Sequence, residues 1–421
     1  MKIKVENIAE FKIKALKFAQ TFEVFCYLDS NNFKDGHTKF DALFAIGVQN
    51  KVKATVGHAF NQLGDFKDHH PGWLFGFLSY DLKNEIEDLV SNNSDGLGFP
   101  DLYFFSPQII ITINSNMVEI NGVNEQKIYN IILSQNSQIA DFKPNVTLKA
   151  KFSKEEYLAN FEKIKNHINQ GDIYVSNFCQ EFFAEDAIIN PLAIFNHLMQ
   201  ISPTPFSSLF KHHSHYTICA SPERFLGKRG NKLVSQPIKG TAKRGKDIEE
   251  DEAIKSALKN NTKELQENVM IVDLVRNDLT RSAKQGTVQT EELFGIYSFN
   301  QVHQMISTIS CELANDISEI QAIKNTFPMG SMTGAPKIKA MQLMEQYERS
   351  KRGPYSGAIG YFSPDGDFDF NVTIRSLFYN QQNKYLSFQV GSAITYHADG
   401  KQEYEECLLK AKAILEVLGV D

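Results

Sequence analysis

The sequence lacks the features that mark several protein classes. Its 421 residues include only five cysteines, with no CxxC pair among Cys26, Cys179, Cys219, Cys311 and Cys407. Cysteines that are widely separated and odd in number predict neither a disulfide framework nor a zinc site. We therefore expect five structural thiols.

Dense basic runs and long apolar runs are also missing. The formal net charge is -6, so the chain has no positive field that would attract nucleic acid or an anionic membrane. Residues 1–18 interleave charges with apolar side chains, which predicts neither a signal peptide nor a membrane span. We expect a cytoplasmic enzyme that holds anionic ligands with locally placed cations.

The composition that is present suits a globular protein, with 42% apolar and 22% charged residues. Short β-rich runs at residues 22–28 and 73–78 characterise the first third, and the single tryptophan, Trp73, is expected in the core. Residues 135–151 are polar and include Pro144, which makes them a candidate linker. This divides the chain into a β-rich segment 1–150 and a segment 151–421.

Helices and strands alternate in the second segment. Ser153 and Glu156 form a capping-box pattern, and the helix that it starts is expected to end at Gly171. The turn sequence Pro364-Asp365-Gly366 lies between two strands, which predicts a hairpin and an α+β fold in place of a Rossmann layout. Further strands are expected at 357–362, 367–376 and 384–395, and further helices at 263–275, 320–326, 337–350 and 401–418.

Two glutamate pairs lie at i, i+3 inside predicted helices: Glu264 with Glu267, and Glu403 with Glu406. This spacing places both carboxylates of a pair on one helix face, where like charges repel unless water screens them or a cation offsets them. Solvated glutamates are one interpretation. The other is a hard cation such as Mg²⁺, which prefers oxygen ligands.

The segments Ser221-Pro222-Glu223-Arg224 and Pro237-Ile238-Lys239-Gly240-Thr241 combine rigid backbone with reactive side chains. Burial beside Ile238 and Gly240 would free the lone pair of Lys239 for attack. A surface lysine in a turn remains the alternative.

Three further segments carry groups that suit a carboxylate ligand. Gly330 to Lys337 is a loop of small residues before a helix that begins near Pro336, and its backbone amides suit an anion, although its glycine spacing excludes a phosphate loop. Arg375 offers a bidentate carboxylate clamp, with a structural salt bridge as the alternative. Gly391-Ser392 permits close backbone approach.

Seven blocks, in this order, carry a resemblance to a known family: SPERFL, PIKGT, ENVMIVDLVRNDLTR, GSMTGAPK, GAIGYF, TIRS and QEYEECLLKAKAIL. They resemble the chorismate-utilising enzymes typified by anthranilate synthase and aminodeoxychorismate synthase component I. The resemblance is dense from Ser153 onward and looser before it, through YLDSNN and GWLFGFLSYDL. It implies two stacked, largely antiparallel β-sheets with helices outside and the active site between them, so segment 1–150 is expected to be part of the same fold.

The resemblance also implies a site. Glu267 and Glu406 match Mg²⁺ ligands, with Glu264 and Glu403 in support through water. The implied substrate-binding residues are Thr241, His303, Thr333, Tyr361, Arg375, Gly391, Ser392 and Lys410. The sequence departs from the family pattern at Gln180, where arginine is frequent, and at Ala393, which replaces a glycine.

Lys239 indicates the branch of the family, because anthranilate synthases carry PIAGT where this chain has PIKGT. The lysine form is similar to aminodeoxychorismate synthase, which implies that Lys239 adds to chorismate at C2 while Glu223 protonates the departing C4 hydroxyl. Ammonia then adds at C4, giving 4-amino-4-deoxychorismate for 4-aminobenzoate and folate. The chain lacks a glutamine amidotransferase signature, so a separate amidotransferase subunit is the implied partner in a heterodimer.

Three alternatives stand beside this interpretation. Anthranilate synthase component I would release 2-aminobenzoate and pyruvate. Isochorismate and salicylate synthases activate water with a lysine where this chain has Val175, which disfavours them. A catalytically silent sensor would use residues 28–31 in an amino-acid pocket, but the complete set of Glu223, Lys239, Glu267 and Glu406 argues against silence.

Overall fold

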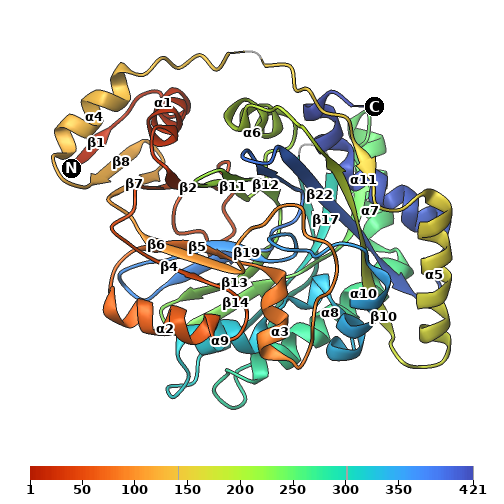
Figure 1. Cartoon of the computed structure of the whole chain (residues 1–421). Coiled ribbons are helices and arrows are strands. Elements are labelled where there is room, and N and C mark those ends of the chain that lie inside the picture. Colours follow the sequence, from red (N-terminus) through yellow and green to blue (C-terminus); the bar gives the residue numbers. More distant parts are fainter. Residues whose placement is uncertain (141, 300–301, 421) are drawn as a thin grey trace.

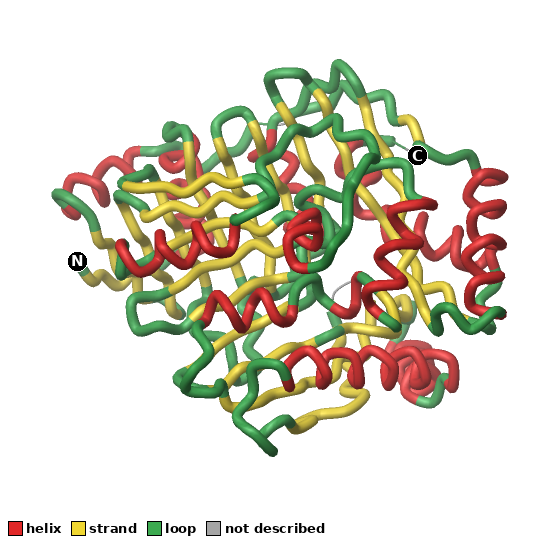
Figure 2. Tube along the Cα trace, turned by 60° about the horizontal axis from the view of Figure 1, so that its bottom comes forward, coloured by secondary structure: helices red, strands yellow, loops and turns green. Residues whose placement is uncertain are grey.

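The computed structural model describes residues 1–140, 142–299 and 302–420. Two antiparallel sheets stack on each other and carry helices on their outer faces (Figures 1 and 2). The predicted fold class is therefore confirmed.

The first sheet has twelve strands within the described residues. In spatial order they are β1 (Lys2–Lys4), β8 (Met117–Asn121), β7 (Ile109–Asn114), β3 (Ala42–Ile46), β2 (Val24–Asp29), β11 (Phe206–His212), β12 (His215–Ser221), β21 (Ser376–Asn380), β22 (Tyr385–Thr395), β10 (Val175–Ala184) and β18 (Gly334–Ala335), with β9 (Lys149–Ala150) beside β10.

The second sheet has ten strands over the same described ranges. They are β15 (Ile238–Lys243), β17 (Val302–Glu312), β14 (Lys232–Gln236), β13 (Arg224–Arg229), β20 (Phe368–Asn371), β19 (Ala358–Phe362), β5 (Leu74–Leu78), β6 (Leu102–Ser106) and β4 (Asn50–Ala54), with β16 (Gln289–Ser298) beside β17. The predicted hairpin is present, because β19 and β20 pair antiparallel across the turn that contains Gly366, whose φ is +80°.

Helices cover the outer face of each sheet. Over the first sheet pack α1 (Ile8–Gln20), α4 (Glu125–Ser134), α5 (Lys154–Asn169), α6 (Pro191–Ile201), α10 (Lys337–Tyr347) and α11 (Gly400–Leu418); over the second pack α2 (Ala59–His69), α8 (Thr262–Thr280) and α9 (Glu319–Thr326). The remaining helical elements are α7 (Ile248–Lys259), the short helix α3 (Lys83–Ile86) and the 3₁₀ turns η1 (Tyr80–Leu82) and η2 (Gly330–Met332). The capping box predicted at Ser153 is present at the start of α5.

Alternation along buried strands produces three apolar cores. On β2, Phe25 and Tyr27 point toward the helices, whereas Val24 and Cys26 point between the sheets, where aromatic side chains of β5 and β6 meet them. A third core lies between the second sheet and its helices. Because each sheet is covered on both faces, its strands are apolar on both sides. All five cysteines are free and buried in these layers.

The first 150 residues contribute strands to both sheets. β2 pairs with β11 in the first sheet, and β5 pairs with β19 in the second. The predicted linker also contacts the first sheet, through a bridge from Asn145 to Ile188 and through β9; Asp141, within it, lies outside the described residues. Trp73, expected in the core, is half-buried at its edge, where it packs against Phe40 and Tyr361.

The strand predicted at 367–376 is wrong in one respect, because it is interrupted. β20 ends at Asn371 and β21 begins at Ser376, and the residue before β21, Arg375, has a φ of +52°. A side-chain-bearing residue adopts this left-handed conformation only where its surroundings enforce it. The interruption lets the chain pass from the second sheet to the first.

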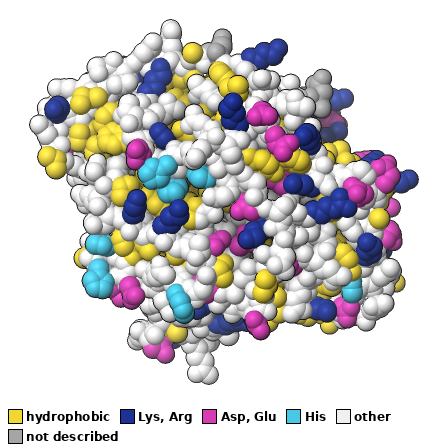
Figure 3. Space-filling model, in the orientation of Figure 1, with side chains coloured by type: hydrophobic (Ala, Val, Ile, Leu, Met, Phe, Trp, Pro, Cys, Tyr) yellow, Lys and Arg dark blue, Asp and Glu magenta, His cyan; other side chains and the backbone are white. Residues whose placement is uncertain are grey.

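The visible surface agrees with the low net charge. Figure 3 shows Lys and Arg side chains interspersed with Asp and Glu across the face that is drawn. Among the described residues, no helix is long and apolar enough to cross a membrane.

Candidate active site

A cavity of about 390 Å³ lies where β10 and β22 of the first sheet face β15 and β17 of the second, with α8 and α11 beside them. Nine of the residues singled out from the sequence line it: Glu223, Lys239, Thr241, Glu264, Glu267, Arg375, Gly391, Glu406 and Lys410. Its lining combines carboxylates and cations with apolar groups, as in sites for small polar ligands.

The two glutamate pairs lie on the helices predicted for them, α8 and α11. Lys263, also on α8, is located between the pairs: its Nζ donates to Glu403 Oε1 at 2.9 Å and lies 3.9 Å from Glu267 Oε1. On α11, Lys410 Nζ lies 2.7 Å from Glu406 Oε1. The carboxylates are therefore offset in part by two lysines.

The remaining charge imbalance shows in the pKa values. Burial raises the pKa of Glu267 to about 7, and the charges of Lys239 and Lys263 oppose this only in part. Burial, followed by repulsion from Glu406, raises the pKa of Glu264. By contrast, Lys410 lowers the pKa of Glu406 to about 2. An additional cation near Glu264 and Glu267 would therefore be bound favourably.

The donor chemistry of this set fits a hard divalent cation, since the groups are carboxylate oxygens on two facing helices. Their present positions do not form a finished site: within the described part of the chain, no three His, Cys, Asp or Glu side chains converge as a metal-binding group. Lys263 occupies the space between Glu267 and Glu403, so an ion held by both pairs would have to displace it.

A bulge in β15 presents Lys239 to the cavity. The pairing of β15 with β17 shifts register between Ile238 and Thr241, and Gly240 has a φ of +101°. A β-carbon at Gly240 would lie 3.1 Å from Met305 Cβ and 3.3 Å from Glu264 Oε2. Because the bulge breaks strand alternation, the consecutive residues Ile238 and Lys239 both line the cavity, as do Gly240 and Thr241.

Glu223 lies in the cavity wall just before β13, and only 3% of its surface is exposed. Burial raises the pKa of its carboxyl to about 7, although the charge of Lys239 acts in the opposite direction. A fraction of the Glu223 carboxyl groups therefore carries a proton near neutral pH, which a general acid requires.

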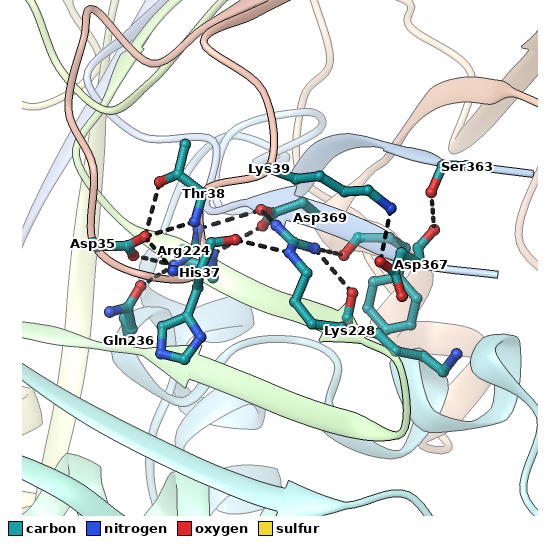
Figure 4. Close-up of polar contacts among 12 residues, drawn as sticks. Asp35, His37, Thr38, Lys39, Arg224, Lys228, Gln236, Ser363, Asp367 and Asp369 are labelled. Carbon is teal, nitrogen blue, oxygen red and sulfur yellow. Dashed lines mark hydrogen bonds and ion pairs between the residues drawn. The ribbon is translucent and has the colours of Figure 1, made fainter. Parts of the chain in front are cut away.

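The next residue, Arg224, forms several polar contacts with neighbouring segments (Figure 4). Its Nε donates to Asp369 Oδ1 on β20 at 2.9 Å, and it also contacts Asp35 in the loop after β2 and Gln236 on β14. Lys39 of the same loop bonds Asp367 at 2.8 Å. These contacts fix the backbone that carries Glu223.

Arg375 projects from the interruption before β21. Its backbone carbonyl accepts a hydrogen bond from Ala220 N at 3.2 Å, whereas no ion pair or hydrogen bond of its guanidinium is found among the described residues. Burial lowers the pKa of Arg375, against attraction from Tyr355 and Glu406. A guanidinium in a cavity without a partner is suited to bind a carboxylate ligand.

Gly391 has a structural reason to be glycine. A β-carbon there would lie 2.6 Å from Cys179 Sγ and 2.9 Å from Asn177 Nδ2 across the β10–β22 pair. Its carbonyl accepts a hydrogen bond from Lys410 Nζ at 2.9 Å. The close approach expected here is thus made by the neighbouring strand.

Five of the expected site residues are placed away from the cavity lining. The Thr333 hydroxyl donates to the carbonyls of Met329 and Gly330, and the Ser392 hydroxyl forms a hydrogen bond with the Tyr157 hydroxyl. Tyr361 lines a separate cavity of about 60 Å³. Glu403 accepts a hydrogen bond from Lys263, and the His303 ring contacts Asp251 and Ser298. On β22 and β17, alternation turns Ser392 and His303 away from the cavity.

Gln304, and not His303, occupies the position in the cavity lining that was expected for the histidine. It lies on β17, one residue further along, and lines the cavity. Other lining residues that the sequence did not single out are Asn177, Lys263, Ser331, Met332, Tyr355 and Gln389. Strand alternation predicts that either 303 or 304 faces the ligand, and only the strand's orientation decides between them.

Comparison with known proteins gives one family. A model of the chorismate binding enzymes matches residues 26–416. The aminodeoxychorismate synthase component 1 of Bacillus subtilis is 32% identical over 372 residues, which cover 84% of this chain and 78% of that protein. Anthranilate synthase component 1 of Cereibacter sphaeroides is also 32% identical, over 81% of this chain and 72% of that protein.

A solved structure has the same fold. The crystal structure of anthranilate synthase component I from Streptococcus pneumoniae superimposes with a TM-score of 0.79 at 25% identity, covering 90% of this chain and 95% of that one. Relatives with two different names are equally similar to this chain, so overall similarity does not separate the two reactions.

Proposed function

We propose that this chain, which belongs to the family of chorismate binding enzymes, replaces the C4 hydroxyl of chorismate with an amino group. The product is 4-amino-4-deoxychorismate, a precursor of 4-aminobenzoate and folate. The observation that carries the proposal is Lys239, which the bulge in β15 presents to the same cavity as the protonated Glu223.

Chorismate is a dianion, and the cavity offers cations to receive it. Arg375, whose guanidinium has no partner among the described residues, would bind one carboxylate in bidentate fashion. Lys410 lies at the same cavity and would contribute to the second. Thr241 and the backbone at Gly391 complete the proposed binding surface.

The proposed reaction has two displacement steps. Lys239 Nζ forms a bond to C2, both conjugated ring double bonds shift toward C4, and the C4–O bond breaks while Glu223 donates a proton, so the hydroxyl leaves as water. Ammonia then forms a bond to C4, both double bonds return, and the C2–Nζ bond breaks to release Lys239. The surplus proton on the new amine can return to the Glu223 carboxylate, which restores the starting state.

Glu267 and Glu406 would hold Mg²⁺, with Glu264 and Glu403 in support. The ion would supply positive charge for the ring carboxylate of chorismate. The raised pKa values of Glu264 and Glu267 support this assignment, because they indicate carboxylates that lack a sufficient counter-charge.

A separate glutamine amidotransferase subunit, in a heterodimer with this chain, is proposed to supply the ammonia. The aminodeoxychorismate synthase of Bacillus subtilis carries the name "component 1", which is consistent with a second component. We place the reaction in the cytoplasm.

Anthranilate synthesis is the second candidate, since relatives with that name are equally similar. The two reactions are separated by incubating the purified chain with chorismate, Mg²⁺ and ammonium at mildly alkaline pH, with and without an aminodeoxychorismate lyase. We expect 4-aminobenzoate only when the lyase is present. Formation of 2-aminobenzoate and pyruvate without lyase would overturn the proposal, and isochorismate would identify water as the nucleophile.

A further inference from the structure

Gln304 carries a polar group that nothing in the described structure satisfies. Its side chain is buried, with 3% of its surface exposed, and it faces the main cavity from β17. Its Oε1 has no hydrogen-bond partner among the described residues. A buried acceptor without a partner is destabilising, so it indicates a ligand atom that donates a hydrogen bond.

A second, smaller cavity adjoins the main one at this position. It has a volume of about 20 Å³ and shares four lining residues with the main cavity: Pro222, Val302, Gln304 and Arg375. Ser202, Pro203, Thr204, Ala220 and Phe299 form the rest of its wall. A volume of about 10–15 Å³ accommodates a molecule the size of water, so one such molecule fits and chorismate does not.

We propose that Gln304 and Arg375 form a subsite for neutral ammonia at the junction of the two cavities. The inference rests on the proposed function, since it names where the nitrogen nucleophile binds. Gln304 Oε1 accepts an N–H from ammonia and leaves the nitrogen lone pair directed away from it. Arg375 borders this subsite, and because its guanidinium would hold a chorismate carboxylate, the bound nitrogen would lie next to the substrate.

The subsite has a definite part in the second displacement. The ammonia lone pair forms the bond to C4 while the C2–Nζ bond breaks and its electrons return to Lys239. Gln304 neither donates nor takes the transferred proton, so it acts by binding and orienting the nucleophile. Its removal should therefore weaken the apparent affinity for ammonia more than the affinity for chorismate.

The test is a steady-state comparison of Gln304→Met with the wild-type chain, with ammonium chloride as the nitrogen source and with chorismate varied separately. We expect the apparent KM for ammonia to rise about tenfold and the KM for chorismate to change less than about twofold, a selective loss equal to about 1.4 kcal/mol. Equal changes in both constants, or no change in the ammonia constant, would overturn the subsite.

Gln389→Met is the matched control. Gln389 lines the same cavity, but its Nε2 already donates to Lys351 O at 3.0 Å, so its loss should not act selectively on ammonia. A selective rise in the ammonia constant in this control would also count against Gln304.

A binding measurement separates failure of the subsite from failure of the proposed function. If the wild-type chain makes no aminated product, the proposed function fails, and the subsite is then judged by thermal unfolding at mildly alkaline pH. Ammonium chloride should raise the Tm above that in equal sodium chloride, and Gln304→Met should abolish the difference. An equal effect in both proteins would reject the subsite independently of catalysis.

Discussion

At the scale of single residues, Gly240 determines what Lys239 can do. A regular strand would turn alternate side chains away from the ligand, but the left-handed φ at Gly240 and the register shift around it keep consecutive residues at the cavity. The PIKGT sequence therefore encodes both the lysine and the backbone that presents it to the cavity. Gly240→Ala would place a methyl group against Met305 and Glu264.

The first prediction concerns Lys239→Ala. Loss of the covalent nucleophile should lower formation of 4-amino-4-deoxychorismate by about 10³-fold or more, whereas chorismate should still bind, because the cations at Arg375 and Lys410 remain. Product formation is measured by mass spectrometry and binding by calorimetry. Unchanged turnover would exclude the covalent step.

The second prediction is a pH dependence set by Glu223. Because burial raises its pKa to about 7, the protonated acid is present below that pH and is lost above it, so kcat/KM for chorismate, measured at a fixed concentration of free ammonia, should fall as the pH rises through about 7. Glu223→Gln should lower kcat by about 10²-fold or more and remove this fall. A wild-type profile that stays flat across this range would contradict the role of the carboxyl as the acid.

Prediction from sequence reached its limit at particular residues. The positions of Glu223 and Lys239 at the cavity and the placement of the glutamate pairs on α8 and α11 follow from spacing and resemblance. Gln304 does not, because the alternation of β17 gives two equivalent choices and the orientation of the strand depends on the whole sheet. The packing reason for Gly391 likewise depends on Cys179, which is distant in sequence.

At the scale of elements, α8 and α11 carry the glutamates and are joined by Lys263. A lysine at this position balances the carboxylates without an ion but would compete with one that binds both pairs. The two helices therefore hold one cation that belongs to the chain itself, and the proposed ion would be the alternative to it.

The third prediction tests this competition with Lys263→Met. Without metal, the variant should be less stable by about 1–3 kcal/mol, because the buried Glu403 carboxylate loses its partner. Mg²⁺ should bind about fivefold more tightly or better, since the charged amino group of Lys263 no longer has to be displaced. Urea unfolding in EDTA and calorimetric titration with Mg²⁺ measure the two effects.

The matched control is Lys255→Met on α7. Lys255 forms an ion pair with Glu252 at 3.4 Å, and the Glu252 side chain is 66% exposed, so its loss should change stability by less than about 0.5 kcal/mol. Weaker Mg²⁺ binding by Lys263→Met would show that the lysine supports the ion instead of competing with it.

The boundaries of helices and strands could be predicted from the sequence where a short local motif marks them. The capping box of α5 and the turn between β19 and β20 are local signals, and both are confirmed. The interruption before β21 is not local: the chain crosses from one sheet to the other there, and the apolar pattern of 367–376 runs through the crossing without a break.

At the scale of the whole molecule, the two sheets depend on the first 150 residues. β2 and β5 are internal strands, each paired on both sides, and most of the core between the sheets comes from these residues. Removing them would leave the edges of β11 and β19 unpaired and would expose the aromatic side chains that they cover.

The fourth prediction follows for a chain limited to residues 151–421. It should lack a cooperative thermal transition and should aggregate, because two sheet edges and the inner core are exposed. Circular dichroism and calorimetry against the full chain measure this. A sharp transition near the Tm of the full chain would show instead that the second segment folds by itself.

The five buried cysteines can report where the molecule unfolds. Burial raises the pKa of every one of these thiols, so none presents a reactive thiolate while the chain is folded. Alkylation by iodoacetamide in native buffer would then proceed at the rate set by unfolding, and mass spectrometry would count the labels. Because Cys311 alone lies in the second sheet, labelling there ahead of the other four would identify that sheet as the part that separates first.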